Sequence, residues 1–226
     1  MPPLSLHHDH RWDLTPTEAV AVQRRLAPLV DTSPLPGGLG NVRTVAGLDV
    51  SVRGDRVRAA VVVLTLPHLK VIDQAIHEDN VAFPYVPGLL SFREVPAVLP
   101  ALEKLKALPD VLMLDAQGRA HPRRMGLACH LGLLLDVPSL GVAKTRLIGR
   151  HAEPLDVKGA AVPLEDKGEE IGVVLRTRER VKPVFVSVGH RMTLDEAALL
   201  TIACTTRYKI PEPTRLAHKL SKDGHL

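Results

Sequence analysis

One short stretch limits the possible folds more than any other part of the chain. A run of four apolar residues, VLML at 111–114, ends abruptly on Asp115 and is followed by the turn AQG. This pattern predicts a buried strand. A carboxylate is costly to bury without a partner, and open α/β sheets bind ligands at the carboxyl ends of their strands. The stretch therefore predicts an α/β fold with a site at this strand end. A turn or helix-capping aspartate is the alternative for Asp115 taken alone.

Hydrophobic periodicity divides the rest of the chain into helices and strands. A capping box, TPTE at 15–18, opens a helix that reaches about residue 30. Strands over 42–50, 56–66 and 69–77 are joined by short turns, so we expect an antiparallel meander. The later elements are a helix over 89–108 that Pro96 and Pro100 interrupt, a helix over 122–135, a strand over 137–143, a loop insertion over 149–170, a hairpin of 171–176 and 184–188, and helices over 197–204 and 211–219.

This order of elements predicts a mixed five-stranded central sheet flanked by helices on both sides. A chain of 226 residues can bury a sizeable core, and we expect residues 1–226 to form a single domain. The N-terminus lacks the apolar region of a signal peptide, and no run reaches the ~18–20 apolar residues of a membrane span. We expect Cys129 and Cys204 to be buried free thiols. We expect the polar N-terminal stretch, with its cluster of His7, His8 and His10, to be a mobile terminus. We therefore expect a cytoplasmic protein.

Two further acids suggest what Asp115 does. Asp49 lies near the end of another apolar strand, in AGLDVS, and adjacent parallel strands would bring it beside Asp115. Carboxylate oxygens are ligands of Mg²⁺. Glu94 and His218 are candidates to complete the site, although a lone Glu on a helix is usually solvated. Lys144 follows the strand over 137–143, where it would reach a phosphate or a metal-bound water. Two ions ~4 Å apart would activate water against a phosphodiester.

Charge and one loop point to a nucleic-acid partner. The net charge of +4 and the pI of about 9.2 favour an anionic partner. Pro84 and Pro87 stiffen the loop that holds Tyr85 and Val86. We interpret this tip as a wedge for insertion between bases; packing on the protein's own surface is the alternative. The sequence contains no Walker A, GxSxG or HExxH motif. Ser51 and Ser187 have no His–Asp partners by order or spacing, which argues against a triad-type hydrolase.

Seven stretches together resemble the endonuclease V family, the deoxyinosine 3′ endonucleases, over nearly the whole chain. They are HRWDLTPTEA, VAGLDVS, FPYVPGLLSFRE, DAQGRAHPRRMGLACHLG, GVAKTRLIG, VSVGHRMT and IPEPTRLAHKL. The resemblance implies a ribonuclease H-like fold and cleavage that depends on Mg²⁺ or Mn²⁺. It places the cut at the second phosphodiester 3′ to a deaminated purine, leaving 3′-hydroxyl and 5′-phosphate ends.

The same resemblance assigns roles to individual residues. Members of the family carry Gly where this chain has Ala116. The implied metal carboxylates are Asp49, Glu94 and Asp115; the C-terminal active-site position is His218; His121 and Lys144 lie near the scissile phosphate; the strand-separating wedge is Pro84, Tyr85, Val86 and Pro87. From the residues themselves we expect backbone N–H groups near Gly88, Ala116 and Gly118 to read the lesion, and Arg123 and Arg146 to contact phosphates.

The implied partner is DNA that carries deoxyinosine or another deaminated base, bound by a monomer. Three alternatives stay open at this point. The chain could act on inosine in RNA, it could be another ribonuclease H-like nuclease, or it could bind nucleic acid without cleaving it. The intact set of acids argues against the last of these.

Overall fold

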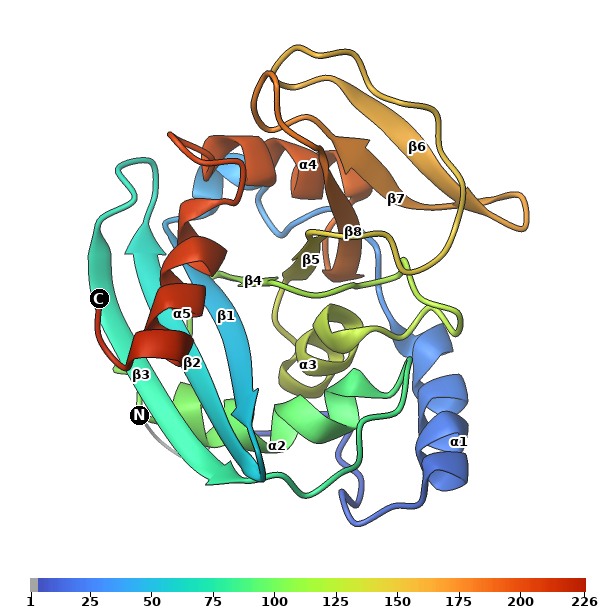
Figure 1. Ribbon diagram of the computed structural model, residues 1–226, viewed down its shortest axis with the longest axis vertical. Coiled ribbons are helices and arrows are strands. Elements are labelled where there is room, and N and C mark those ends of the chain that lie inside the picture. The colour runs from blue at the N-terminus through green and yellow to red at the C-terminus, as the bar shows by residue number, and fades with distance from the viewer. Residues whose placement is uncertain (1–3) are drawn as a thin grey trace.

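An eight-stranded mixed sheet forms the centre of the protein, and helices cover both of its faces (Figure 1). The computed structural model describes residues 4–226. The strand order is β3-β2-β1-β4-β5-β8-β7-β6. The strands are β1 (Thr44–Arg53), β2 (Arg56–Thr65), β3 (Val71–Asn80), β4 (Val111–Leu114), β5 (Ser139–Ala143), β6 (Ala161–Asp166), β7 (Glu169–Leu175) and β8 (Val184–His190).

The five strands expected from the sequence are present, but the sheet does not end with them. β1, β2 and β3 form the expected antiparallel meander, and β4 lies parallel to both β1 and β5. β8 then pairs antiparallel with β5 and carries β7 and β6 with it. The prediction of a five-stranded sheet was therefore too small. The expected hairpin is part of the same sheet.

Segment 149–170 was wrongly expected to be a loop, because it contains β6. This strand lies at the edge of the sheet and is only partly buried. An edge strand tolerates proline and charge, and β6 contains Pro163 and ends on Asp166. Its sequence therefore lacks the continuous apolar run of the central strands, and its strand pairing is set by β7.

Helices on the two faces divide the core into two main layers. α2 (Leu90–Glu103) and α3 (Leu127–Leu135) pack on one face, and α4 (Leu194–Ala203) and α5 (Glu212–Asp223) on the other (Figure 1). α1 (Pro16–Leu26) packs outside α3, with the expected capping box intact.

Two helices differ from the sequence prediction. α2 is one helix through Pro96 and Pro100. The buried side chains of Val95 and Val98 pack it onto the sheet, and Phe92 packs it against α1 and Phe83; such packing outweighs a lost backbone bond. α3 begins at Leu127 instead of 122, because backbone bonds hold the preceding residues on β8: the Arg119 N–H donates to the Val188 carbonyl at 2.8 Å.

The described part of the N-terminal segment is packed, which contradicts the expectation of a mobile end. The His10 ring stacks on His130 at 5.0 Å and lies 4.4 Å from the ring of Trp12. Cys129 and Cys204 are buried free thiols, as expected. Among the described residues, no helix has the length and apolar character needed to cross a membrane.

Candidate active site

β1 and β4 bring the two aspartates to neighbouring positions. The parallel register pairs Leu48 with Leu114, and Asp49 and Asp115 follow directly on each strand. The Asp115 N–H donates to the Leu48 carbonyl at 3.2 Å and continues the ladder. Side chains alternate between faces along a strand, so Asp49 lies on the face of Val45, which packs beneath α5. The strand order thus confirms the expected neighbourhood of the two acids.

A glycine allows α5 to lie directly on β1. A Cβ on Gly47 would lie 1.9 Å from the Pro213 carbonyl oxygen, so a larger residue would push the start of the helix away. The inner face of α5 buries small and apolar side chains at helical spacing. They are Pro213, Thr214, Ala217, Leu220 and Ser221.

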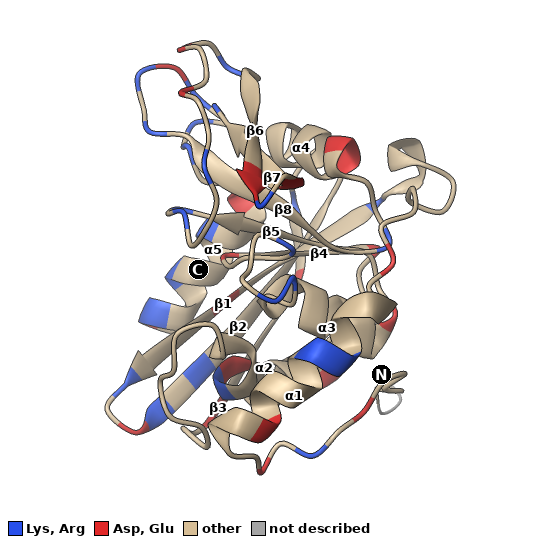
Figure 2. Cartoon of the chain, turned by 90° about the vertical axis from the view of Figure 1, so that its right-hand side faces the viewer, with Lys and Arg blue, Asp and Glu red and all other residues tan. Residues whose placement is uncertain are grey.

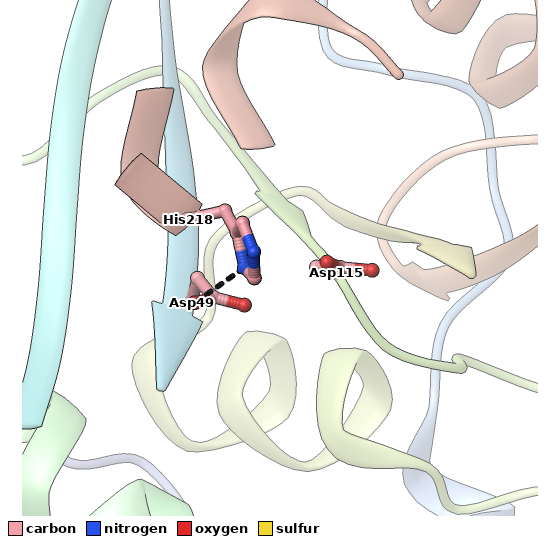
Figure 3. Close-up of side chains that lie close together, drawn as sticks. All are labelled: Asp49, Asp115 and His218. Atoms are coloured by element: carbon pink, nitrogen blue, oxygen red, sulfur yellow. Dashed lines mark hydrogen bonds and ion pairs between the residues drawn. The ribbon is translucent and has the colours of Figure 1, made fainter. Parts of the chain in front are cut away.

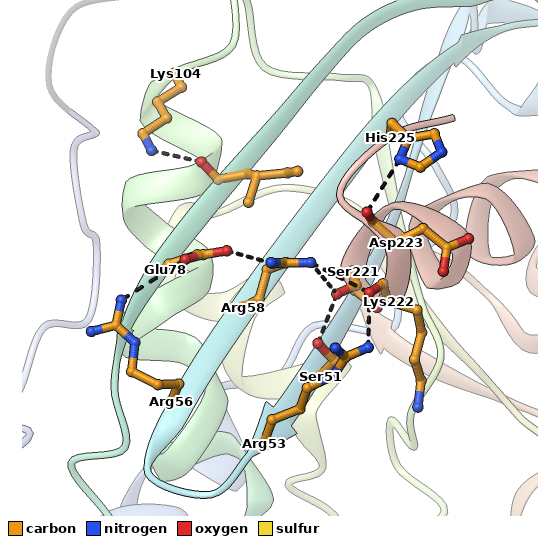
Figure 4. A network of polar contacts seen from close by, with 11 residues as sticks. Ser51, Arg53, Arg56, Arg58, Glu78, Lys104, Ser221, Lys222, Asp223 and His225 are labelled. Atoms are coloured by element: carbon orange, nitrogen blue, oxygen red, sulfur yellow. Dashed lines mark hydrogen bonds and ion pairs between the residues drawn. The ribbon is translucent and has the colours of Figure 1, made fainter.

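The other end of α5 is fastened to the same strands. The last carbonyl groups of a helix have no partner within it. Here the Ser51 hydroxyl donates to the Ser221 carbonyl at 2.8 Å, and the Arg53 guanidinium donates to the Lys222 carbonyl at 2.9 Å (Figure 4). Arg58 lies beside the same two carbonyls. With both ends held, His218 in the middle of α5 is placed above β1.

These contacts assemble a compact group of metal-ligand atoms. One ligand atom each from Asp49, Asp115 and His218 lie within 4.8 Å of one another (Figure 3). His218 Nδ1 is 3.3 Å from Asp49 Oδ2, and the Ser221 hydroxyl donates to the same oxygen at 2.5 Å. Sequence reasoning missed Ser221. Its only signal was its position three residues after His218, on the same helix face.

The third acid approaches from the opposite face of the sheet. Glu94 on α2 lines a cavity of about 50 Å³ together with Asp49 and Asp115. Burial, followed by the charge of Asp49, raises the pKa of Glu94 to about 8. Burial also raises the pKa of Asp49 above its ordinary value. We call Asp49, Glu94 and Asp115 the carboxylate cluster.

The carboxylate cluster is chemically suited to a hard divalent cation. It gathers three acids around one small cavity, and burial raises the pKa of two of them, Asp49 and Glu94. Lys144 donates to Asp115 and is the cation bonded to the cluster, at a half-exposed position. Oxygen ligands and a nearby imidazole fit Mg²⁺ or Mn²⁺.

A larger cavity of about 350 Å³ adjoins the cluster at Asp115. This volume lies within the range of small-molecule pockets. The 84–87 loop forms one side, with Tyr85 71% exposed at its tip. Lys144 and Arg146 line the opposite side. Gly88 and Ala116, expected at the lesion pocket, line it as well.

Three donors converge on the carbonyl of Gly88, the residue that directly follows the 84–87 loop. They are the Gln23 amide at 2.9 Å, the His121 Nε2 at 3.0 Å and the Arg123 guanidinium at 2.7 Å. Arg123 also donates to the Gln23 amide oxygen at 2.5 Å. We call Gln23, His121 and Arg123 the Gly88 clamp. The role of Gln23 was not predicted from the sequence, because the hydrophobic periodicity of a helix does not single out a polar residue.

The Gly88 clamp changes the interpretation of two predicted residues. His121 accepts the Arg123 backbone N–H at Nδ1, so Nε2 carries the proton that it donates to Gly88. Burial, followed by the charge of Arg123, lowers the pKa of His121 to about 4. Both ring nitrogens and much of the Arg123 guanidinium are therefore engaged inside the protein, where the sequence suggested phosphate contacts. Arg146 is exposed and remains suited to that role.

Gly118 was expected to read the lesion, but the structure gives it another environment. Its N–H donates to the Ser187 hydroxyl at 2.8 Å. A Cβ there would lie 2.0 Å from the Val188 carbonyl oxygen. Among the described residues, Gly118 is not part of the wall of the large cavity. The glycine therefore lets this segment pack against β8, and its N–H is already used.

Comparison with known proteins shows which family shares this sequence and fold. The sequence profile of the family described as endonuclease V matches residues 25–219. The chain belongs to the endonuclease V family. The endonuclease V of Roseiflexus sp. strain RS-1 is 49% identical over 218 residues, which cover 96% of this chain and 97% of the relative. This family membership makes the chain a deoxyribonuclease V-type hydrolase.

Solved endonuclease V structures share the fold. The protein from Streptomyces avermitilis is 45% identical, covers 94% of both chains and superposes with a TM-score of 0.87. That from Ciona intestinalis is 28% identical, covers 92% of this chain and 96% of its own, and has a TM-score of 0.80; it was crystallised with a 24mer DNA containing an inosine followed by a ribo-adenosine. The expected ribonuclease H-like α/β fold is thereby confirmed. Endonuclease V enzymes are metal-dependent, and the group formed by Asp49, Asp115 and His218 could hold the ion.

Proposed function

We propose that this endonuclease V repairs DNA at deoxyinosine and cleaves the second phosphodiester 3′ to the lesion, leaving 3′-hydroxyl and 5′-phosphate ends. The observation that carries the proposal is the junction of the carboxylate cluster with the large cavity at Asp115. A flipped base in the cavity would leave its strand passing beside the acids. We further propose that it acts as a cytoplasmic, single-domain monomer.

The 84–87 loop is the proposed strand-separating wedge. Tyr85 is exposed between two prolines, and Val86 and Pro87 line the cavity entrance. An aromatic side chain on a stiff loop can enter a base stack at little entropic cost. The Gly88 clamp holds the end of this loop, so the wedge and the cavity wall keep one relative position.

Asp49, Glu94 and Asp115 are the proposed ligands of Mg²⁺, with His218 beside them; Mn²⁺ would substitute. A bound divalent cation supplies positive charge that stabilises the charge developing on the scissile phosphate. The protein's own groups orient the reaction. Ser221 holds the Asp49 carboxylate through one hydrogen bond, and Lys144 holds that of Asp115. Lys144 and Arg146 line the cavity where a phosphate would pass.

Basic groups provide a path for the DNA backbone. Lys and Arg lie on α5 and on the loops beside β6 and β7 (Figure 2). α5 lies beside the carboxylate cluster through His218, and phosphate contacts of this kind supply affinity without sequence preference. Action on inosine in RNA is the open alternative, so inosine-containing RNA belongs in the test.

The proposal is tested by incubating the protein with Mg²⁺ and an end-labelled duplex that carries one deoxyinosine. We expect one cut, at the second phosphodiester 3′ to the lesion, and no cut in the matching undamaged duplex or in EDTA. Equal cutting of both duplexes, or none, would refute the proposal. A strand with inosine in RNA, run in parallel, decides whether the ribose sugar is accepted.

A further inference from the structure

The chain has two tyrosines, and both are exposed. Tyr85 is at the tip of the proposed wedge. Tyr208, which is 45% exposed, lies in the short loop that joins α4 to α5 (Figure 1). The three phenylalanines, in contrast, are all buried. Exposed tyrosines are typical of binding surfaces, because the ring offers a large contact area and the hydroxyl stays hydrated. The position of Tyr208 therefore requires an explanation.

The loop that carries Tyr208 is fastened to a neighbouring segment. Three side chains of residues 158–178 donate to alternate carbonyls of this loop. They are Lys158 to Thr205 at 3.1 Å, Arg178 to Arg207 at 2.9 Å and Thr177 to Lys209 at 2.6 Å. We call residues 205–209 the Tyr208 loop. Its backbone is held in one conformation while the side chains of residues 206–208 remain exposed, as in loops that a rigid scaffold presents for binding.

The Tyr208 ring itself is oriented by a fixed cation. The Arg215 guanidinium lies 4.8 Å from the ring centroid, a distance at which the two attract each other. Glu212 holds this guanidinium through hydrogen bonds of 3.0 and 2.6 Å. Arg207 also lies near the ring, at 5.7 Å, but it is exposed. The protein thus presents an ordered aromatic ring with a second guanidinium beside it in solvent.

The Tyr208 loop lies beside the carboxylate cluster. Arg215 precedes His218 on α5 by three residues, about 4.5 Å along the helix axis. At the other end of the loop, Lys209 is close enough to Lys144 and Lys182 for their charges to act on it. Burial, followed by these two charges, lowers the pKa of Lys209.

Two of these three lysines lack an acidic partner. Lys144 pairs with Asp115, whereas Lys182 and Lys209 form no ion pair among residues 4–226. Cations that gather without acids attract an anionic ligand. An aromatic ring beside such cations is the combination with which proteins bind single-stranded nucleic acid: the ring stacks on a base and the cations follow the phosphates.

We propose that the Tyr208 loop binds the substrate strand on the 3′ side of the cut: the Tyr208 ring stacks on a base of that strand, and Lys182 and Lys209 contact its phosphates. This inference rests on the proposed function, which assigns the large cavity to the lesion. Because the cut lies 3′ to the lesion, the strand that continues past Asp115 toward His218 is the 3′ portion.

The first test removes the stacking partner from the strand and from the protein in turn. The substrate is a single-stranded oligonucleotide with one deoxyinosine. In a series of such strands, one base at a time, at each of the first few positions 3′ to the cut, is replaced by a tetrahydrofuran abasic site. Single-turnover cleavage in Mg²⁺ is measured below saturation. We expect the wild type to lose about tenfold at one position of the series, the range for a base stacked on an aromatic side chain.

In Tyr208→Leu, removing the same base should cost less than about twofold, and the loss should fall on the intact strand. Tyr208→Phe, which keeps the ring, should restore the tenfold dependence. The control is Leu199→Ala at an exposed position on α4, which should show the wild-type pattern. The stacking role is overturned if no position matters to the wild type, or if Tyr208→Leu keeps the dependence. A lower melting temperature in that second case would show that the ring only packs on Arg215.

The second test addresses the phosphate contacts. Binding of the intact strand is measured by fluorescence anisotropy at several salt concentrations in Ca²⁺, a hard cation like Mg²⁺. Lys182→Met and Lys209→Met should each reduce the slope of log K against log salt by about 0.7, the value for one phosphate of a single strand. Lys70→Met, at an exposed position before β3, should keep the wild-type slope. Unchanged slopes in both lysine variants would overturn the phosphate contacts.

The two tests separate this inference from the proposed function. A wild type that leaves the deoxyinosine strand uncut refutes the proposed function itself. A wild type that cuts it at the expected phosphodiester, with no effect of the bases 3′ to the cut and with unchanged salt slopes in the lysine variants, refutes only the role of the Tyr208 loop.

Discussion

The carboxylate cluster and the Gly88 clamp flank the same cavity, but they are built in opposite ways. The cluster gathers like charges, and burial raises the pKa of two of its acids. In the clamp, by contrast, three donors converge on one carbonyl, and Gln23 links Arg123 to the Met125 carbonyl as well. The clamp satisfies its polar groups within the protein, whereas the cluster leaves charge for a ligand to compensate.

This difference separates residues that bind from residues that position. A group of like charges is costly in the free protein, so its presence indicates a cation that the protein is built to receive. A satisfied network holds its members in one geometry instead. Removing a cluster acid should therefore abolish activity without loss of stability. Removing a clamp contact should lower both.

The largest effect is expected for Asp115→Asn. Cleavage of deoxyinosine DNA in Mg²⁺ should fall by at least about 1000-fold, because a ligand at the reacting phosphate is lost. The midpoint of urea unfolding in EDTA should stay unchanged or rise, because a negative charge leaves the cluster. The control, Asp55→Asn in the exposed turn after β1, should keep wild-type activity. Cleavage within tenfold of wild type would contradict this prediction.

The next effect is expected at Gly88. Its φ of +80° strains any other residue, and a Cβ would lie 2.8 Å from the Arg123 guanidinium. Gly88→Ala should lower the free energy of unfolding by about 1–2 kcal/mol and cleavage by about 100-fold. Gly54→Ala is the control, because Gly54 has a φ of +61° but nothing within 4 Å of its Cβ position. The clamp interpretation fails if both variants lose the same activity.

A pH effect of intermediate size is expected at His121. Its folded-state pKa of about 4 lies below the ordinary 6.5. Its contribution to stability is therefore present above pH 6.5 and is lost as the pH falls toward 4. The loss is at most about 3 kcal/mol.

His121→Gln should reduce this pH dependence, measured by urea unfolding between pH 7 and pH 4 in EDTA. The control His68→Gln, at an exposed position, should retain the wild-type profile. If the two variants show the same acid dependence, His121 is not held neutral by the clamp.

The smallest effect is expected for Lys144→Met. The ion pair with Asp115 is made by a lysine side chain that is 40% exposed, and such pairs contribute little to folding. Thermal unfolding in EDTA should change by less than about 1 kcal/mol, whereas cleavage should fall clearly. A large loss of stability with full activity would place Lys144 among the structural residues and blur the contrast between cluster and clamp.

Particular residues show how far sequence reasoning reached. Asp49 and Asp115 were predicted to meet because one lies near the end of an apolar strand and the other directly follows one, and adjacent parallel strands bring such positions together. β1 in fact continues past Asp49 to Arg53. The 84–87 loop was marked by its prolines. Gln23 and Ser221 carried no comparable signal, because each acts through contacts with residues far away in the chain.

The same reason explains where the structure departs from the sequence pattern. Segment 149–170 lacks the apolar pattern of a buried strand, because β6 lies at the edge of the sheet. It is held as a strand by its pairing with β7. Gly118 sits in a motif near the cavity, yet its N–H is used by Ser187 on β8. Arg123 stands in a basic run, but its guanidinium turns inward to Gly88 and Gln23.

The sequence by itself determined the α/β class, the meander, the strand that ends on Asp115 and the family motifs, because these depend on local periodicity and residue type. Only the tertiary structure decided which polar groups are satisfied and which remain free. That property depends on distances between segments that packing brings together. It separates the Gly88 clamp from the carboxylate cluster.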